Sequence, residues 1–376
     1  MRSVAVNLHR TDCRHFLGDR PCRFRRLCDG CPHFAPMGLR ILLIKLAATG
    51  DVLRTTPLLP ALKRAHPVSH VTWVTRPEAL ELLAGLDEID RLLPLDVDAL
   101  AHLPAERFDV VICLDKEPAA TGLAAQIDAP DKRGFVLGPH GNPLPADANA
   151  AYAYRLGLDD ELKFRTNRRT YQEIAFEMAG LAWSGDDYRL ALPDAARARA
   201  RERWSALGVA ESETVIGLNV GAGDVFAYKS WRVDGWAALA DRIHDALGAR
   251  VALLGGPRDR ARVEAVAKRA RAPLLDPGAT PSIACFAALL ERCAAVVAGD
   301  TLALHLALAL QRRVVAIFGS TSAPEVHLYG RGERVVPPVD CHPCYKRSCD
   351  LPYTCADAVS ADAVFESLVR VLGAPA

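Results

Sequence analysis

The feature that most constrains the fold is an alternation of short apolar runs with helical patterns that begins near Gly38. Runs such as 40–45 and 110–114 have the length and the apolar content of buried parallel strands. Stretches with helical spacing, such as 58–65 and 79–86, lie between them, and 260–269 has the same spacing further along the chain. Strands that alternate with helices predict an α/β domain with a mostly parallel sheet.

The alternation restarts after an extended segment at 186–193, which we interpret as a linker. We expect a first lobe at 38–190 and a second lobe at 191–340. A polar, cysteine-rich extension (1–37) comes before them, and a cysteine cluster with a closing helix (341–376) comes after them. Neither sheet is large enough to form a barrel, so we expect two Rossmann-like, doubly wound lobes that face a cleft.

Composition and charge exclude several classes of protein. The 376 residues hold 46 Lys and Arg against 45 Asp and Glu, and a net charge of +1 gives no field that would attract nucleic acid. No apolar run approaches the roughly 20 residues that span a bilayer. The first 37 residues lack the apolar core of a secretory signal. We therefore expect a cytoplasmic protein, with at most peripheral contact with the inner face of the membrane.

A carboxylate stands directly after the first strand. The chain turns at Gly50, and Asp51 lies where the next helix begins. Asp51 could cap that helix. It could also act as a general base, because residues at the carboxyl end of a first strand face the cleft of such a sheet. Arg54 shares the helix face of Asp51.

Glycines follow two strands of the second lobe. They would let backbone N–H groups approach a phosphate, and Lys229 could reach the same group. The same residue type is also common in tight turns that bind nothing. The residues concerned are Gly221, Ala222 and Gly223 after one strand, and Gly255 and Gly256 after the next.

The sharpest motif is a strand that runs through Asp300 and Thr301 into a helix. Thr301 and the free N–H groups at the helix start could hold a diphosphate. Asp300 could accept protons from sugar hydroxyls, and His305 lies one turn along the same helix face. Alternatively, Asp300 is only a helix cap and His305 is a hydrogen-bonded core residue, which is the more usual role for such a histidine. Thr321 belongs to one more loop of small residues that could bind an anion.

Taken in order, these motifs resemble glycosyltransferase family 9, whose best-known members are the lipopolysaccharide heptosyltransferases. The resemblance runs from about Gly38 to the C-terminus and depends on the ordered set. It implies a GT-B fold, with an acceptor-side lobe at 38–190 and a nucleotide-sugar-binding lobe at 191–340. The sugar donor would usually be ADP-heptose, and transfer would be inverting and need no catalytic metal. The motifs that support the resemblance are Gly50-Asp51-Val52, Gly221-Ala222-Gly223 with Lys229-Ser230-Trp231, Gly255-Gly256, Asp300-Thr301 with His305, and Phe318-Gly319-Ser320-Thr321.

The resemblance also implies roles for single residues. Asp51 would be the general base that deprotonates the acceptor hydroxyl. Lys229 would balance the charge on the departing diphosphate, and Thr301 with nearby amides would bind the same group. Asp300 would hold the donor sugar. Leu302 stands where the family usually has glycine, and its side chain would crowd the approach to the diphosphate.

On the acceptor side, Gly50, Arg54, Arg76 and Lys116 are the candidates. The three basic residues could anchor a phosphorylated or acidic acceptor, and each could equally be a solvated surface charge. We expect a transferase that moves a sugar, a heptose by the resemblance, to a lipopolysaccharide-core-like or other glycan or glycolipid. Two alternatives stay open: a nucleotide-sugar epimerase of the same fold, and a vestigial transferase that binds metal, senses redox state or recruits a partner.

Eight of the eleven cysteines fall into two groups of four. Four thiolates complete the shell of a structural zinc ion, and an iron or iron–sulfur centre accepts the same ligands. Free thiols and disulfides are the alternatives, and whether the groups form one site or two stays open. The N-terminal group lies outside the family resemblance, whereas the C-terminal group resembles a pattern found in many family members. The groups are Cys13, Cys22, Cys28 and Cys31, and Cys341, Cys344, Cys349 and Cys355.

Overall fold

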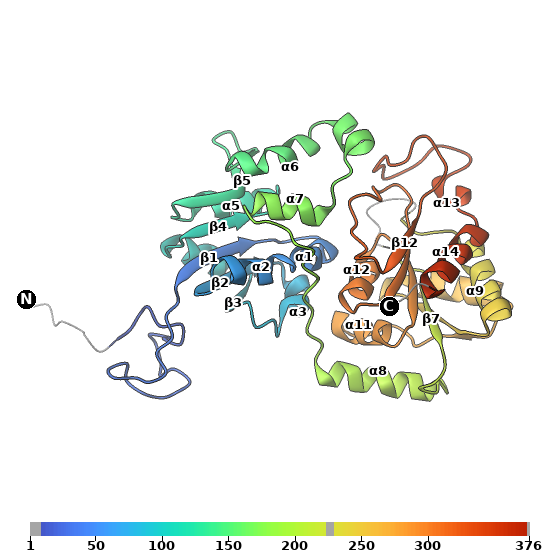
Figure 1. Cartoon of the computed structure of the whole chain (residues 1–376), viewed down its shortest axis with the longest axis horizontal. Coiled ribbons are helices and arrows are strands. Elements are labelled where there is room, and N and C mark those ends of the chain that lie inside the picture. Colours follow the sequence, from blue (N-terminus) through green and yellow to red (C-terminus); the bar gives the residue numbers. More distant parts are fainter. Residues whose placement is uncertain (1–8, 223–228, 374–376) are drawn as a thin grey trace, which may run out of the picture.

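The computed structural model describes residues 9–222 and 229–373. Two α/β lobes lie side by side, and the N-terminal extension projects from the first lobe (Figure 1). In the described residues, no helix is long and apolar enough to cross a membrane.

The first lobe holds a six-stranded sheet in the order β3-β2-β1-β4-β5-β6. Its neighbouring strands are parallel except for β6, which runs antiparallel to β5. The strands are β1 (Leu39–Ile44), β2 (Ser69–Thr75), β3 (Arg91–Pro94), β4 (Val110–Cys113), β5 (Asp131–Leu137) and β6 (Pro143–Pro145). The helices are α1 (Thr49–Thr55), α2 (Leu58–Ala65), α3 (Leu80–Leu83), α4 (Val97–His102), α5 (Pro118–Gln126), α6 (Ala151–Leu156) and α7 (Tyr171–Met178).

The second lobe holds a parallel sheet in the order β12-β11-β10-β7-β8-β9. Its strands are β7 (Val215–Asn219), β8 (Arg250–Leu254), β9 (Leu274–Leu275), β10 (Ala295–Gly299), β11 (Arg313–Ile317) and β12 (Gly332–Val335). Its helices are α8 (Asp194–Ala206), α9 (Val233–Leu247), α10 (Arg260–Arg269), α11 (Ile283–Glu291), α12 (Leu302–Ala309), α13 (Cys355–Ala358) and α14 (Ala361–Gly373). The closing helix α14 packs on α9, β11 and β12, and so completes this lobe.

Both sheets have the doubly wound strand order, as the alternation predicts. The order reverses between β1 and β4 in the first sheet and between β7 and β10 in the second. Ligands of such sheets bind where the order reverses, beyond the carboxyl ends of the strands. The two reversal points are therefore where a site is expected.

The strands are apolar on both faces because helices cover both sides of each sheet. In β1, Ile41 and Leu43 face one buried cluster, whereas Leu42 and Ile44 face another. The first of these clusters continues across the lobe junction, where Leu53 of α1 joins the same core as Leu304 of α12. A shared core fixes how the two lobes face each other.

Candidate functional site

The starts of α1 and α12 meet at the lobe junction. A Cβ atom on Gly50 would lie 3.2 Å from Cδ2 of His305 and 3.8 Å from Cα of Leu302. A side chain at position 50 would therefore have to push His305 away. Gly50 was predicted to bind the acceptor, and the structure places it against the second lobe.

Asp51 lies in the first turn of α1, and its side chain is 39% exposed. Ala48 occupies the N-cap position, so Asp51 does not cap the helix. Its Oδ1 accepts a hydrogen bond from Nη1 of Arg54 at 3.2 Å. Burial alone would raise the pKa of Asp51, but the charges of Lys45 and Arg54 outweigh burial and lower it. Asp51 is therefore ionised at neutral pH, as a general base must be.

Arg54 is buried and connects the two lobes. Its Nη2 donates to the carbonyl oxygen of Glu325 at 2.6 Å, and its guanidinium lies 4.4 Å from the ring centre of Tyr171. With only 8% of its surface exposed, it is not a solvated surface charge. Its hydrogen bond to Oδ1 of Asp51 instead holds and orients that carboxylate.

A buried ion pair that the sequence analysis missed lies at the reversal point of the first sheet. Lys45, which directly follows β1, pairs with Asp115, which follows β4. Nζ of Lys45 also donates to the carbonyl oxygen of Ala47 at 2.6 Å. Asp115 in turn accepts from the backbone N–H of Leu46. These bonds fix the turn that presents Asp51. The available signal was a pair of opposite charges directly after two neighbouring strands.

In the second lobe, Asp300 stands between two basic groups. Its Oδ2 lies 3.4 Å from Nζ of Lys229, and its Oδ1 lies 3.8 Å from Nε2 of His305. Burial would raise the pKa of Asp300, but the charge of Lys229 outweighs burial and lowers it. Thr321 is buried beside Asp300. An ionised Asp300 fixes the position of the Lys229 ammonium.

His305 is buried between the lobes, where its Nδ1 makes a 3.0 Å hydrogen bond with the Tyr188 hydroxyl. Burial, assisted by the charge of Arg54, lowers the pKa of His305 to about 3. The residue is therefore neutral at physiological pH. It does not line the cavity described next, and its surroundings are those of a hydrogen-bonded core histidine.

A cavity of about 480 Å³ opens beyond the carboxyl ends of β7 and β8. Thr301 occupies the N-cap position of α12 without a side-chain cap, so the first N–H groups of this helix are left for a ligand. A Cβ on Gly221 would lie 2.1 Å from Oδ2 of Asp259, so a side chain at position 221 would require the Asp259 carboxylate to move. The predicted residues that line the cavity are Gly221, Ala222, Gly256, Thr301 and Leu302.

The other predicted donor residues that the structure describes lie outside this lining. Gly255 is next to the lining residue Gly256, and its Cβ would lie 2.9 Å from Cβ of Asp259. Gly223 lies outside the described residues. Asn219, Thr280, Ser282 and Phe286 also line the cavity. The sequence analysis missed these four because they have no motif of their own.

Two of the predicted acceptor residues are held within the first lobe. Arg76 pairs with Glu117 at 2.7 Å. Lys116 donates to the carbonyl oxygen of Ala153 at 2.8 Å, and burial lowers its pKa. A ligand would have to displace these contacts in order to use either residue.

A basic cavity of about 560 Å³, also missed from the sequence, lies between the lobes. Arg165 and Arg168 line it from the segment before α7, and Arg334 lines it from β12. The lining includes no carboxylate. Within residues 9–222 and 229–373, none of these three arginines forms an ion pair with an acidic side chain. The signal in the sequence was the run of basic residues from Lys163 to Arg169.

The two cysteine groups line separate cavities, one in the extension and one in the segment before α13. All eleven cysteines are free thiols. In the described part of the chain, no three His, Cys, Asp or Glu side chains lie close enough together to hold a metal ion. The metal prediction for both groups therefore stays a prediction.

Comparison with known proteins places these features in a family. The model of glycosyltransferase family 9 (heptosyltransferase) matches residues 101–354, about two thirds of the chain. Lipopolysaccharide heptosyltransferase 1 of Pseudomonas aeruginosa is 26% identical over 339 residues, which cover 83% of this chain and 87% of that protein.

Solved structures share the fold. A glycosyltransferase of family 9 from Veillonella parvula has a TM-score of 0.72 and 21% identity, covering 89% of this chain and 97% of its own. The E. coli ADP-heptose heptosyltransferase II has a TM-score of 0.63 and 19% identity, covering 89% and 98%. An E. coli heptosyltransferase solved with ADP has a TM-score of 0.55 and 18% identity, covering 88% and 97%. The fold is therefore GT-B, as expected.

Proposed function

Because the chain belongs to glycosyltransferase family 9, we propose that it transfers a heptose from ADP-heptose, with inversion, to a hydroxyl of a lipopolysaccharide core or a similar glycan or glycolipid. One observation carries the proposal. Asp51 of the first lobe and the Asp300–Lys229 pair of the second lobe stand at the same lobe junction, beside a cavity of about 480 Å³. Relatives named for this activity support the choice of sugar.

The donor diphosphate would lie at the start of α12. Backbone N–H groups after Thr301 and the positive end of the helix dipole favour a doubly charged group there. Lys229, held by Asp300, supplies a further positive charge as the bond to the diphosphate breaks. These groups provide the charge stabilisation for which other transferases use a metal ion, so we propose a reaction without one.

Asp51 would take the proton. The acceptor oxygen attacks the anomeric carbon from the face opposite the diphosphate, the acceptor proton moves to Asp51, and the bonding electrons leave with the diphosphate. Arg54 and Lys45 keep Asp51 deprotonated before this step. Attack from the opposite face inverts the anomeric centre.

We place an anionic group of the acceptor in the basic cavity. Arg165, Arg168 and Arg334 require no broken ion pair to bind it, whereas Arg76 would first have to leave Glu117. Arginine side chains bind phosphate and carboxylate groups in a bidentate manner. The acceptor would thus be a phosphorylated or acidic glycan. If it is a glycolipid, the enzyme would reach it from the inner face of the membrane.

Calorimetric titration tests the donor assignment. We expect ADP to bind the purified chain at least about tenfold more tightly than UDP or GDP, and Lys229→Ala to weaken ADP binding by about tenfold or more, because a charge-assisted contact is lost. Lys268→Ala, an exposed lysine on α10, is the matched control and should bind ADP like the parent chain. Equal binding of the three nucleotides would remove the support for ADP-heptose.

A further inference from the structure

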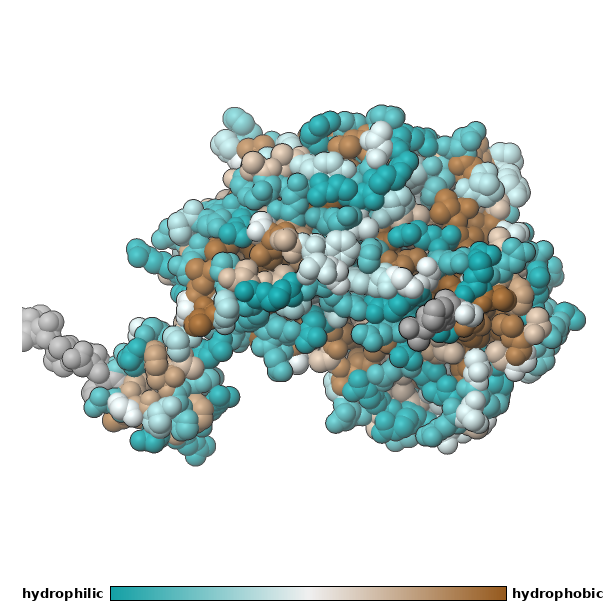
Figure 2. Space-filling model, in the orientation of Figure 1, coloured by the Kyte–Doolittle hydropathy of each residue, from teal (hydrophilic) through white to brown (hydrophobic). Residues whose placement is uncertain are grey.

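Residues 9–37 form a small module that has almost no hydrophobic core. Cys13 is the one buried residue among them. Apart from a single bridge between Cys13 and Pro36, the module contains no helix or strand before β1. Figure 2 shows it as a separate small body beside the first lobe. A chain segment of this size cannot bury enough apolar surface to order itself and usually needs a disulfide or a metal.

Each cysteine of the module opens a backbone turn. The carbonyl oxygens of Cys13 and Cys22 accept from the N–H groups three residues ahead, at 2.9 and 2.8 Å, and those of Cys28 and Cys31 do the same at 3.3 Å. A turn directs successive N–H groups to one side and so forms a concave site for an anion. Four such turns, each beginning at a cysteine, are suited to four thiolates.

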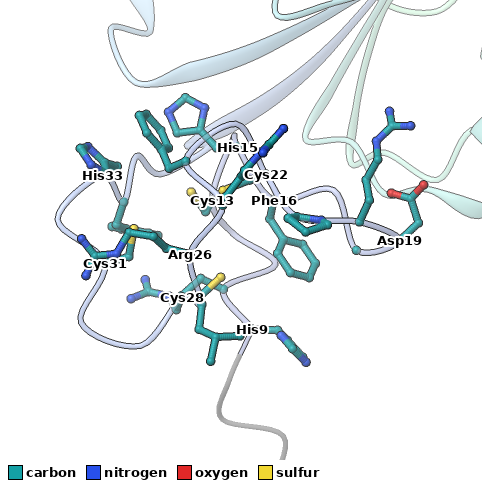
Figure 3. A pocket seen from close by; sticks show the side chains of 18 residues that line it. His9, Cys13, His15, Phe16, Asp19, Cys22, Arg26, Cys28, Cys31 and His33 are labelled. Carbon is teal, nitrogen blue, oxygen red and sulfur yellow. The ribbon is translucent and has the colours of Figure 1, made fainter.

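The four cysteines line one cavity of about 420 Å³. Figure 3 shows the four cysteines around the same opening. His15 and His33 stand beside them, and the His33 ring stacks on Phe24 with 4.0 Å between ring centres. The candidate metal ligands are therefore mostly sulfur atoms, and none of these four cysteines forms a disulfide.

The charge of the module also suits thiolates. Residues 9–37 contain six arginines and three aspartates, an excess of three positive charges. Four thiolates around a divalent ion carry a net charge of −2, which this excess offsets.

We propose that Cys13, Cys22, Cys28 and Cys31 bind one structural divalent transition-metal ion, of the kind that zinc represents. Binding replaces four S–H bonds with four metal–sulfur bonds and releases four protons to the solvent. In the described residues, no three ligand side chains converge as they stand. The thiols must therefore move toward one another when the metal binds. Binding would draw the turns together and order the module.

The position of the module makes this ion structural. Nη2 of Arg14 donates to Asp90 and to the carbonyl oxygen of Ser69, which lies at the amino end of β2. The proposed active site lies beyond the carboxyl ends of the strands. The metal is thus expected to order the extension without touching the reacting groups, and the inference does not depend on the proposed function.

Cobalt titration of the reduced full chain, without oxygen, tests the site. We expect thiolate-to-cobalt charge-transfer absorption that saturates with at least one equivalent of Co²⁺. The variant Cys28→Ser/Cys31→Ser should bind one equivalent less. The variant Cys341→Ser/Cys344→Ser should keep that equivalent, and Cys285→Ser, a change in α11, is the control for substitution of a thiol.

Alkylation with peptide mapping gives a second measurement on the unchanged sequence. Cobalt or zinc should protect Cys13, Cys22, Cys28 and Cys31 from alkylation by at least about tenfold. The proposal is overturned if these four thiols react equally with and without metal, if the N-terminal variant binds as much cobalt as the parent, or if the reduced parent chain binds less than a tenth of an equivalent.

Discussion

At the scale of the residue, the decisive feature is the way in which two carboxylates are kept charged at the lobe junction. Asp51 and Asp300 both lose solvent, which by itself would favour their protonation. Lys45 and Arg54 counter this at Asp51, and Lys229 counters it at Asp300. Each carboxylate thus has its own cation, so one can act as a base while the other holds a lysine.

Asp51→Asn tests the base. An amide cannot accept the acceptor proton, so kcat should fall by roughly 10²-fold or more, while the Kd for ADP changes little. The measurement is the initial rate of sugar transfer, together with nucleotide titration. Asp98→Asn, a change in the first turn of α4, should leave both values unchanged. Parent-level turnover in Asp51→Asn would remove Asp51 from the mechanism.

At the scale of the element, most helices and strands follow from apolar periodicity. The expected helix at 260–269 coincides with α10, whereas the helix expected at 79–86 is shortened to Leu80–Leu83. It starts late because Pro77 opens a separate 3₁₀ turn, and it ends early because Gly85 takes a φ of +83°. Helix α5 was not predicted. Its segment is apolar without a polar face and thus lacks the periodic signal.

The start of α11 is capped from the other lobe. The Glu81 carboxylate accepts from the backbone N–H groups of Ile283 and Ala284 at 2.9 and 3.2 Å. Glu81→Ala should lower the free energy of unfolding by about 1 kcal/mol, because two helix N–H groups lose a charged acceptor near the positive end of the dipole.

Urea denaturation measures this change, and hydrogen exchange at Ile283 and Ala284 localises it. Glu78→Ala, an exposed neighbour of the same charge, should be neutral. Unchanged protection of the two amides in Glu81→Ala would show that this carboxylate does not tie the lobes together.

At the scale of the whole molecule, the lobe junction itself should respond to pH. His305 is buried there as the neutral form, with its pKa lowered to about 3, whereas an unfolded histidine titrates near pH 6.5. Between these values the unfolded chain binds the extra proton, so stability falls as the pH drops below about 6.5. At pH 5, the protonation of this group in the unfolded chain lowers the free energy of unfolding by about 2 kcal/mol relative to neutral pH.

The variant His305→Asn isolates that contribution, because asparagine keeps a hydrogen-bonding group near Tyr188 and does not titrate. Denaturation at pH 7 and at pH 5 should show a smaller acid loss in the variant than in the parent chain, by about 2 kcal/mol. The other histidines are common to both chains and cancel. Equal acid losses would mean that His305 is not neutral in the folded state.

The sequence by itself determined the local structure and the identity of the motifs. Apolar runs and helical spacing are properties of neighbouring residues, and so the two doubly wound sheets could be predicted, as could the loops that carry the candidate residues Asp51 after β1 and Asp300 after β10. The order of Gly50-Asp51, Lys229 and Asp300-Thr301 was also sufficient to indicate the family.

Only the tertiary structure decided which residues meet. The Lys45–Asp115 pair, the contact of Arg54 with Glu325 and the basic cavity of Arg165, Arg168 and Arg334 join segments far apart in the chain. No periodic pattern records such contacts, because they arise when two sheets pack around a common core. The close approach at Gly50 has the same origin, because the residue that a side chain there would have to push away, His305, lies 255 positions later in the chain.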